Sequence, residues 1–201
     1  MKVKSILLSC AAFAALSATA SAALMTYTET GFLTGSLGGT SFSNKAVAVR
    51  VTADTANVQY VLYGGFIPLW TNAGVTTIDI DGFETATFNG SDVIGVFNEN
   101  LSAIQPGMAA VGIADLTSLN GMLGNYQTTE LHYALDTEKT FTGLASTAQA
   151  TYSTTLGNLI TTSASGNATF TAALATVPEP SALALLGLGT IGLIARRRRT
   201  A

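Results

Sequence analysis

The chain has 201 residues, of which 48% are hydrophobic and only 10% are charged, and its formal net charge is −3. A chain this acidic and poor in charge is a poor match for nucleic acids or anionic membrane surfaces, because both attract basic proteins. The single cysteine, Cys10, excludes an intramolecular disulfide framework and a cysteine-based metal site.

The first 22 residues have the three-part layout of a secretory signal peptide. Two lysines precede an apolar stretch over residues 6–16, and Ala20 and Ala22 supply the small residues that a signal peptidase requires. We therefore expect cleavage after Ala22, which would also remove Cys10 from the exported protein.

Residues 23–176 follow as one exported domain of 154 residues, which is long enough to bury a hydrophobic core. This region holds 11 acidic residues and three cations, a net charge of −8. The negative charge favours solubility.

Short alternating runs recur through this domain. AVAVRVTA at 46–53 places three valines on one face of a strand, and VTTIDIDGF at 75–83 places two isoleucines on one face and two aspartates on the other. Pairs of turn-forming residues separate such runs. This pattern predicts an all-β fold, a single-domain antiparallel β-sandwich of jelly-roll or Ig-like type. A threonine-rich strand solenoid has a similar composition and is the alternative.

Two finer predictions concern individual segments. Asp81-Gly82 and Asn89-Gly90 are tight-turn pairs that predict a meander of three strands across Thr76–Asn98. In DLTSLNGMLGNY, at 115–126, Asp115 can cap a short helix, but two glycines weaken it. For this segment we expect a loop with at most a turn or two of helix.

The only histidine, His132, lies in ELHYAL at 130–135. Strand alternation groups His132 with Glu130 and Ala134, opposite the larger apolar residues, so we expect it to face solvent. A secreted hydrolase with a Ser/His/Asp triad remains an alternative, although no nucleophile-elbow pattern accompanies the histidine.

Acidic residues gather around the expected hairpin at 75–88. Asp79, Asp81 and Glu84 can approach one another there, and Asp92 can join them. Oxygen ligands at this spacing suit Ca²⁺, and a carboxylate pair suits glycoside hydrolysis, yet DIDGFE lacks the ligand ladder of a known calcium loop. We expect a solvated acidic sheet face, and no metal ion or other cofactor.

The segment QYVLYGGFIPLW, at 59–70, is the best binding candidate. Aromatic faces stack on sugar rings, so Tyr63, Phe66 and Trp70 are the predicted carbohydrate contacts of a polysaccharide-binding module. Packing in the core is the competing interpretation, because an alternating strand also needs apolar contacts.

The last 25 residues, 177–201, read VPEPSALALLGLGTIGLIARRRRTA. Pro178, Glu179 and Pro180 hold the backbone extended. The uncharged run 181–195 would span roughly 22 Å as a helix, less than the roughly 30 Å hydrocarbon core, so we expect a short transmembrane helix. By the positive-inside rule, a basic cluster stops transfer and stays in the cytoplasm: Arg196, Arg197, Arg198 and Arg199.

Pro-Glu-Pro, a short apolar run and a terminal arginine cluster, in this order, resemble a PEP-CTERM sorting signal. The resemblance implies processing near Pro-Glu-Pro by an exosortase, an integral-membrane enzyme of Gram-negative bacteria that usually also produce exopolysaccharide. It implies export across the inner membrane, a transient membrane anchor, and then a place at the cell surface or in the extracellular, biofilm matrix.

The start of the domain, TYTETGFLTGSLGGTSFSNKAVAVRVTADTANV at 26–58, resembles β-rich uncharacterised PEP-CTERM proteins. This resemblance supports the β fold and implies no reaction. We therefore expect a non-enzymatic exported protein of the cell surface or exopolysaccharide matrix, with a polysaccharide-binding module as the alternative.

Overall fold

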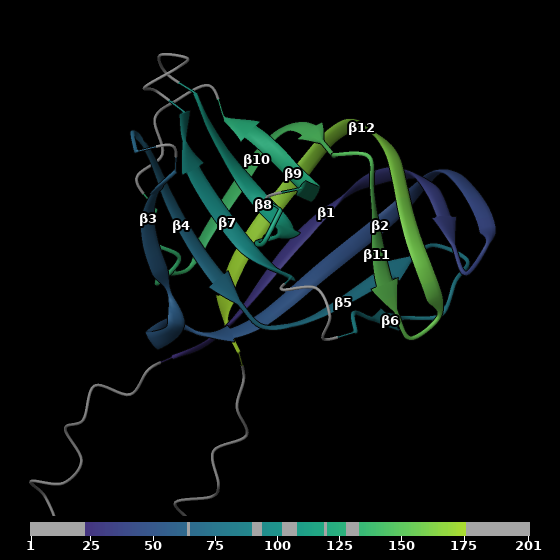
Figure 1. Ribbon diagram of the computed structural model, residues 1–201, viewed down its shortest axis with the longest axis horizontal. Helices are drawn as coiled ribbons and strands as arrows, with labels where there is room; N and C mark the ends of the chain where they lie inside the picture. Colours follow the sequence, from purple (N-terminus) through teal and green to yellow (C-terminus); the bar gives the residue numbers. More distant parts are fainter. Residues whose placement is uncertain are drawn as a thin grey trace, which may run out of the picture.

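The computed structural model describes residues 23–63, 65–89, 94–101, 108–118, 120–127 and 133–175. These residues form one 12-stranded antiparallel sheet (Figure 1), which confirms the all-β prediction. A short 3-10 turn, η2 (Thr55–Asn57), follows the second strand. The strands in chain order are β1 (Leu24–Leu37), β2 (Thr40–Asp54), β3 (Gln59–Tyr63), β4 (Ile67–Ala73), β5 (Val75–Ile80), β6 (Ala86–Thr87), β7 (Ile94–Asn100), β8 (Ala109–Asp115), β9 (Asn120–Gln127), β10 (Lys139–Ser146), β11 (Ala150–Thr154) and β12 (Gly157–Leu174).

One continuous sheet supplies both of the layers that a sandwich needs. Its strand order is β3-β4-β7-β8-β9-β10-β12-β1-β2-β5-β6, and β11 pairs with β12 beside this path. The sheet curls, so that β4, β7 and β9 face β1, β2 and β5 across the interior. The two packed layers are therefore halves of one sheet.

The first and last strands of the domain lie at the centre of the sheet. β1 pairs with β12 along its length, from Met25 opposite Leu174 to Leu37 opposite Leu159, and β2 flanks β1 on the other side. The Ala175 backbone N–H donates to the Leu24 carbonyl at 2.8 Å. Both ends of the domain therefore leave the sheet side by side, at the bottom of Figure 1.

At the end of the molecule farthest from β3, the sheet closes on itself. Phe88, directly after β6, forms a bridge with Thr154 of β11. Two backbone bonds extend this contact, from the Asn89 N–H to the Ser153 carbonyl and from the Thr155 N–H to the Thr87 carbonyl, both at 2.9 Å. β12, β1, β2, β5, β6 and β11 thereby form a closed ring of strands (Figure 1).

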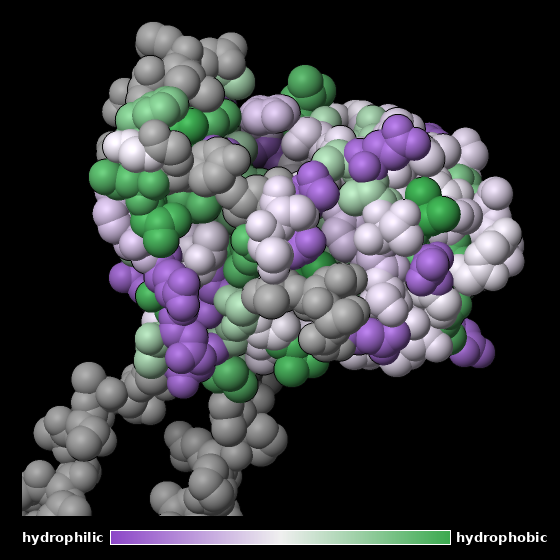
Figure 2. All heavy atoms as spheres, in the orientation of Figure 1, coloured by the Kyte–Doolittle hydropathy of each residue, from purple (hydrophilic) through white to green (hydrophobic). Residues whose placement is uncertain are grey.

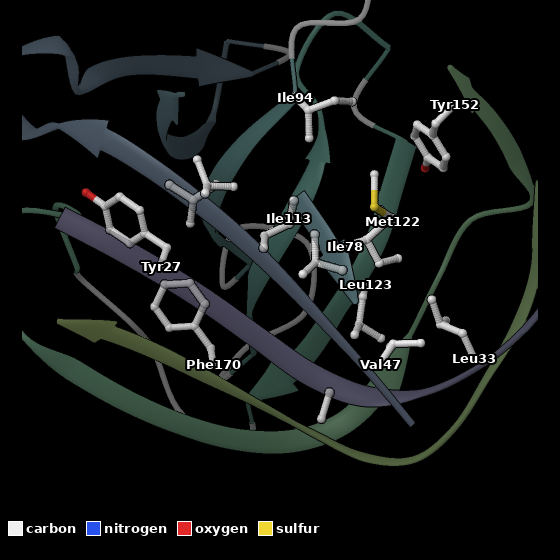
Figure 3. Close-up of a cluster of buried hydrophobic side chains, with 14 of the residues drawn as sticks. Tyr27, Leu33, Val47, Ile78, Ile94, Ile113, Met122, Leu123, Tyr152 and Phe170 are labelled. Carbon is white, nitrogen blue, oxygen red and sulfur yellow. The ribbon is translucent and has the colours of Figure 1, made fainter. Parts of the chain in front are cut away.

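The alternating residues fill the interior as the sequence predicts. The three valines of 46–53 and the two isoleucines of 75–83 are buried, while Arg50 and Asp79 lie on the outer face. Figure 3 shows the Tyr27 ring beside that of Phe170, with centroids 6.2 Å apart. Leu123 and Met122 of β9 complete the same core (Figure 3).

Two of the finer predictions need correction. Asp81-Gly82 does begin the connection between the antiparallel strands β5 and β6, but β7 pairs with β4 and β8, so the three-stranded meander is wrong. β6 is only two residues long, and the bridge at Phe88 takes the chain to β11 instead.

The segment 115–126 is also different from the prediction, because most of it is strand β9. Asp115 accepts hydrogen bonds from the Thr117 backbone N–H at 2.9 Å and the Ser118 hydroxyl at 2.8 Å, and so shapes a turn where a helix cap was expected. The apolar side chains beyond it then pack as strand residues, since β9 is paired on both sides.

The predicted signal peptide at 1–22 and the sorting segment at 177–201, with its membrane helix at 181–195, lie outside the described residues. The domain boundaries at 23 and 176 stay predictions.

The close approach of β1 to β12 gives a testable prediction at Gly35. A Cβ atom on Gly35 would lie 2.0 Å from the Ile160 carbonyl oxygen, whereas one on Gly121 would meet no heavy atom within 4 Å. Gly35→Ala should therefore lower the free energy of unfolding by about 2 kcal/mol or more, as overpacking does. Gly121→Ala should stay within about 0.5 kcal/mol. Urea unfolding of both variants checks this, and equal effects would contradict the register.

Candidate functional site

A shallow groove of about 640 Å³ crosses the outer face of β12, β1, β2 and β5. Its floor is low because the residues opposite the outward-facing side chains of β1 are alanines: Ala46 opposite Phe32 and Ala48 opposite Thr30. The Phe32 ring is 44% exposed and stands above this floor. Asn167 and Thr169 of β12 line the other side. The groove therefore offers one aromatic face among small and polar side chains.

Two ion pairs border the groove, each joining β2 to the acidic side of the β5–β6 hairpin. The Lys45 ammonium lies 3.1 Å from the Asp81 carboxylate, and the Arg50 guanidinium donates to Asp79. The Thr85 hydroxyl also donates to Asp79, and these hydrogen bonds from Thr85 and Arg50 lower the pKa of its carboxyl. Both pairs are solvent-exposed, so their contribution to stability is small.

These ion pairs involve two of the carboxylates that the sequence analysis considered as calcium ligands. The carboxylates of Asp79 and Asp81 point to cations of β2, and Asp92 lies outside the described residues. Among the residues that the structure describes, no group of three His, Cys, Asp or Glu side chains could hold a metal ion.

The aromatic segment predicted at 59–70 forms the hairpin of β3 and β4. Phe66, at its turn, is 54% exposed. Trp70 is half-buried, and its ring lies against that of Tyr60 with centroids 5.0 Å apart. The Tyr63 backbone pairs with Ile67, while its side chain is outside the description. Of the three predicted sugar contacts, Phe66 is therefore open to solvent and Trp70 is partly covered.

A row of cross-strand neighbours runs inward from this hairpin. Tyr60 lies opposite Trp70, Trp70 opposite Asn98, Asn98 opposite Val111, and Val111 opposite Asn125. Successive members of such a row share one face of the sheet. The row thus passes from the exposed Tyr60 and the half-buried Trp70 to two fully buried asparagines.

These asparagines belong to an inner polar cluster of Tyr27, Glu29, Asn72, Asn98 and Asn125. The Asn72 side-chain amide donates to the Tyr27 hydroxyl at 3.2 Å, and that hydroxyl donates to the Leu135 carbonyl. The Asn98 amide donates to the Tyr133 carbonyl at 2.7 Å. The cluster therefore fastens the segment after residue 132 to the inside of the sheet.

Glu29 is the one carboxyl in this cluster, and its side chain is 0% exposed. The Asn125 amide donates to Glu29 Oε1 at 2.9 Å, and Oε2 has no hydrogen-bond partner among the described residues. Burial raises the Glu29 pKa well above its ordinary value of 4.5, and the bond from Asn125 offsets only part of this effect. The neutral carboxyl is therefore favoured in the folded protein.

The sequence analysis missed Glu29, although a signal was present. In MTYTET, alternation places Met25, Tyr27 and Glu29 on one face, which sets a carboxyl directly in line with two core residues. A carboxyl in such a row is either a surface residue of a half-buried strand or a buried acid. The burial of Met25 and Tyr27 decides for the second.

The region around the histidine is only partly described, and His132 lies outside the described residues. Tyr133 and Leu135 are buried, as the alternation of ELHYAL predicts, yet they belong to an irregular segment. Leu135 has a positive φ of 59°, which a regular strand would not allow.

One family model matches the chain, that of the PEP-CTERM protein-sorting motif, over residues 176–199. The match includes Pro178, Glu179 and Pro180 and the four arginines at 196–199. The chain is a PEP-CTERM protein. Neither a curated protein nor a solved structure matches it.

As a PEP-CTERM protein, the chain is an exosortase substrate, exported and sorted through a passing association with the membrane. Within the described ranges, no helix has the length and apolar character needed to cross a membrane. The motif begins one residue after Ala175, which is bonded to Leu24 at the start of β1. The sorting motif therefore follows directly on the completed sheet.

Glu29 gives a prediction on pH and stability. A carboxyl whose pKa is raised on folding contributes stability below its ordinary pKa of 4.5, and this contribution is lost as pH rises through the folded-state pKa. Between the pKa of the unfolded state and that of the folded state, Glu29 is protonated in the folded protein and ionised in the unfolded one. Over this range the free energy of unfolding of the wild type falls by about 1.4 kcal/mol per pH unit. Glu29→Gln keeps an oxygen for Asn125 and cannot ionise. The variant should therefore gain stability relative to the wild type between pH 4 and pH 8.

Chemical denaturation across that pH range measures the difference. Asp79→Asn is the control of opposite sign: its pKa is lowered, so the variant should lose a little stability at pH 8 and none at low pH. A constant difference between wild type and Glu29→Gln would contradict a buried neutral carboxyl.

Proposed function

We propose that this PEP-CTERM protein is a non-enzymatic component of the cell surface or the exopolysaccharide matrix. The observation that carries the proposal is the sorting motif at 176–199, placed directly after the last strand of the exported domain. A motif that delivers the domain to the cell surface requires no chemistry of the domain itself.

The surroundings of three carboxyl groups, Asp79, Asp81 and Glu29, support a non-enzymatic role. Glycoside hydrolysis needs two carboxyl groups open to one substrate. Asp79 and Asp81 are each paired with a cation of β2, and Glu29 is sealed in the interior. The hydrogen bonds and ion pairs that these three carboxyl groups make leave them poorly placed for acid–base catalysis on a shared substrate.

As a partner within the matrix we propose exopolysaccharide, held in the groove across β12, β1, β2 and β5. A sugar ring has an apolar face that stacks on an aromatic ring, and hydroxyl groups around its rim that pair with planar polar side chains. Phe32 offers the ring, and Arg50, Asp79 and Asn167 offer donors and acceptors beside it. Because the cations are already paired, the groove suits a neutral sugar better than a strongly anionic one.

The first test concerns processing. Protein released from the producing cells should begin after Ala22 and end near Pro178, Glu179 and Pro180, because exosortase acts at this motif. Intact-mass measurement reads both ends. A variant with Pro178→Ala and Pro180→Ala should stay with the membrane fraction. Released protein that still carries Arg196, Arg197, Arg198 and Arg199 would contradict sorting through the motif.

The second test concerns the polysaccharide. Wild-type protein should sediment with exopolysaccharide purified from the same cells. Phe32→Ala should weaken this binding about tenfold, the equivalent of about 1.4 kcal/mol. Phe66→Ala and Trp70→Ala are matched aromatic controls in the hairpin and should bind normally. Loss of binding in the hairpin variants alone would move the site to β3 and β4, and no binding by the wild type would exclude this partner.

A further inference from the structure

The two edge strands of the sheet differ in their hydrogen-bond partners among the described residues. At one end, β6 and the residues after it are bonded to β11, which closes that side of the sheet. At the other end, β3 is the terminal strand, and its only strand partner among the described residues is β4. In Figure 1, β3 stands at the far left of the molecule. An unpaired edge presents a row of backbone N–H and C=O groups to which a further strand can be added.

The sequence of β3 has neither a charged residue nor a proline, the residues that usually prevent such pairing at a sheet edge. Natural edge strands are usually protected by charged side chains, proline or bulges. Gln59–Tyr63 contains no charge and no proline, and Tyr60, Val61 and Leu62 are 55%, 45% and 52% exposed. These three consecutive residues point to both faces of the strand. Figure 2 shows apolar side chains gathered over β3 and β4, at the left of the view.

The surroundings of the edge extend this apolar surface on both faces. On one face, a hollow of about 790 Å³ lies beside the strand and is lined by Val61, Leu69 and Leu116 among others. On the other face, Tyr60 lies against Trp70. Phe66, at the turn between β3 and β4, is also exposed. Added strand residues would therefore find apolar contacts whichever way their side chains point.

We propose that β3 pairs with β3 of a second copy of this chain, antiparallel about a two-fold axis. A charge-free strand suits this partner, because two copies of a domain with a net charge of −8 repel each other elsewhere. An antiparallel edge is complementary to itself, so one surface serves both subunits. Because the β6 end is bonded to β11, the assembly stops at two copies and forms no open fibre.

The pairing is tested by the mass of the released protein in sedimentation-velocity and light-scattering experiments. The wild type should have twice the monomer mass. Leu62→Lys, which places a charge in the pairing, should have the monomer mass. Leu144→Lys is the matched control, since Leu144 is 65% exposed on β10 and away from the edge. This variant should keep the twofold mass.

A cross-link tests the register independently of stability. When β3 pairs with itself about its centre, Val61 lies opposite Val61 of the second copy, at a Cα separation of about 5 Å that suits a disulfide. In a Cys10→Ser background, Val61→Cys should form a covalent dimer on mild oxidation, and Leu144→Cys should not.

Three results would overturn the proposal. The first is a wild-type protein of monomer mass up to about 1 mM, where even a contact of −4 kcal/mol is half formed. The second is dissociation by Leu144→Lys as well as by Leu62→Lys. The third is a monomeric wild type whose polysaccharide binding is lost on Leu62→Lys, which would assign the edge to the polysaccharide.

Discussion

The pairing of the first strand with the last is the constraint on which the rest of the fold depends. β1 and β12 lie at the centre of the strand order, so every other strand is attached to one of them directly or through neighbours. Their partners are separated by nearly the whole domain, for example Met25 and Leu174. Contacts of such high sequence separation form slowly, because a long loop must close first. The sheet is therefore complete only when its last strand is available.

This constraint links the fold to the sorting of the protein. Ala175, bonded to Leu24, is the last described residue, and the sorting motif begins at residue 176. The described sheet thus uses the sequence up to Leu174, the last residue of β12. A processing step near Pro-Glu-Pro cuts the chain after β12, so it leaves the strands of the described sheet uncut.

The sequence predicts the local features of this fold well and its long-range pairing poorly. Alternation at 46–53 and 75–83 gives the right strands and the right buried faces, since period two is a local property. The third strand of the expected meander is misassigned because β6 is too short to show a pattern and Phe88 pairs with a residue 66 positions later. β9 was mistaken for a loop because its glycines and apolar residues resemble a weak helix. Choice of partner strand depends on tertiary packing that no short run of sequence contains.

The candidate surfaces also divide into those made of contiguous residues, which the sequence can reveal, and those assembled from several strands, which it cannot. The aromatic hairpin could be found from sequence because its residues are contiguous, although the exposure of each ring could not. The groove could not be found, because Phe32, Arg50, Asp79 and Asn167 come from four strands. Glu29 was visible only as a carboxyl in an apolar row, and its burial depends on Asn125 from the opposite layer.

One cross-strand row has a buried carboxyl group bonded to its inner end and an exposed aromatic side chain at its outer end. At its inner end Asn125 binds the buried Glu29, and at its outer end Tyr60 is open to solvent. Burying a carboxyl and exposing large apolar side chains both lower the stability of an isolated domain. The inner end compensates by joining the two layers of the sheet through a hydrogen bond. At the outer end, the contact of Tyr60 that the described residues supply is the ring of Trp70, and the proposed pairing with a second copy would bury the exposed side chains of β3.

The groove and the β3 edge lie on different strands, and this separation links the proposed dimer to the proposed binding of polysaccharide. A dimer formed through β3 leaves β12, β1, β2 and β5 uncovered in both copies, so it would carry two grooves related by a two-fold axis. Two weak sites on one rigid body raise the apparent affinity for a repeating polymer, because the second contact is made at high effective concentration. When the two grooves of one dimer bind two different polysaccharide molecules, the dimer cross-links them. Weak sugar binding in each groove would then be enough to hold exopolysaccharide together, which a single-site monomer could not do.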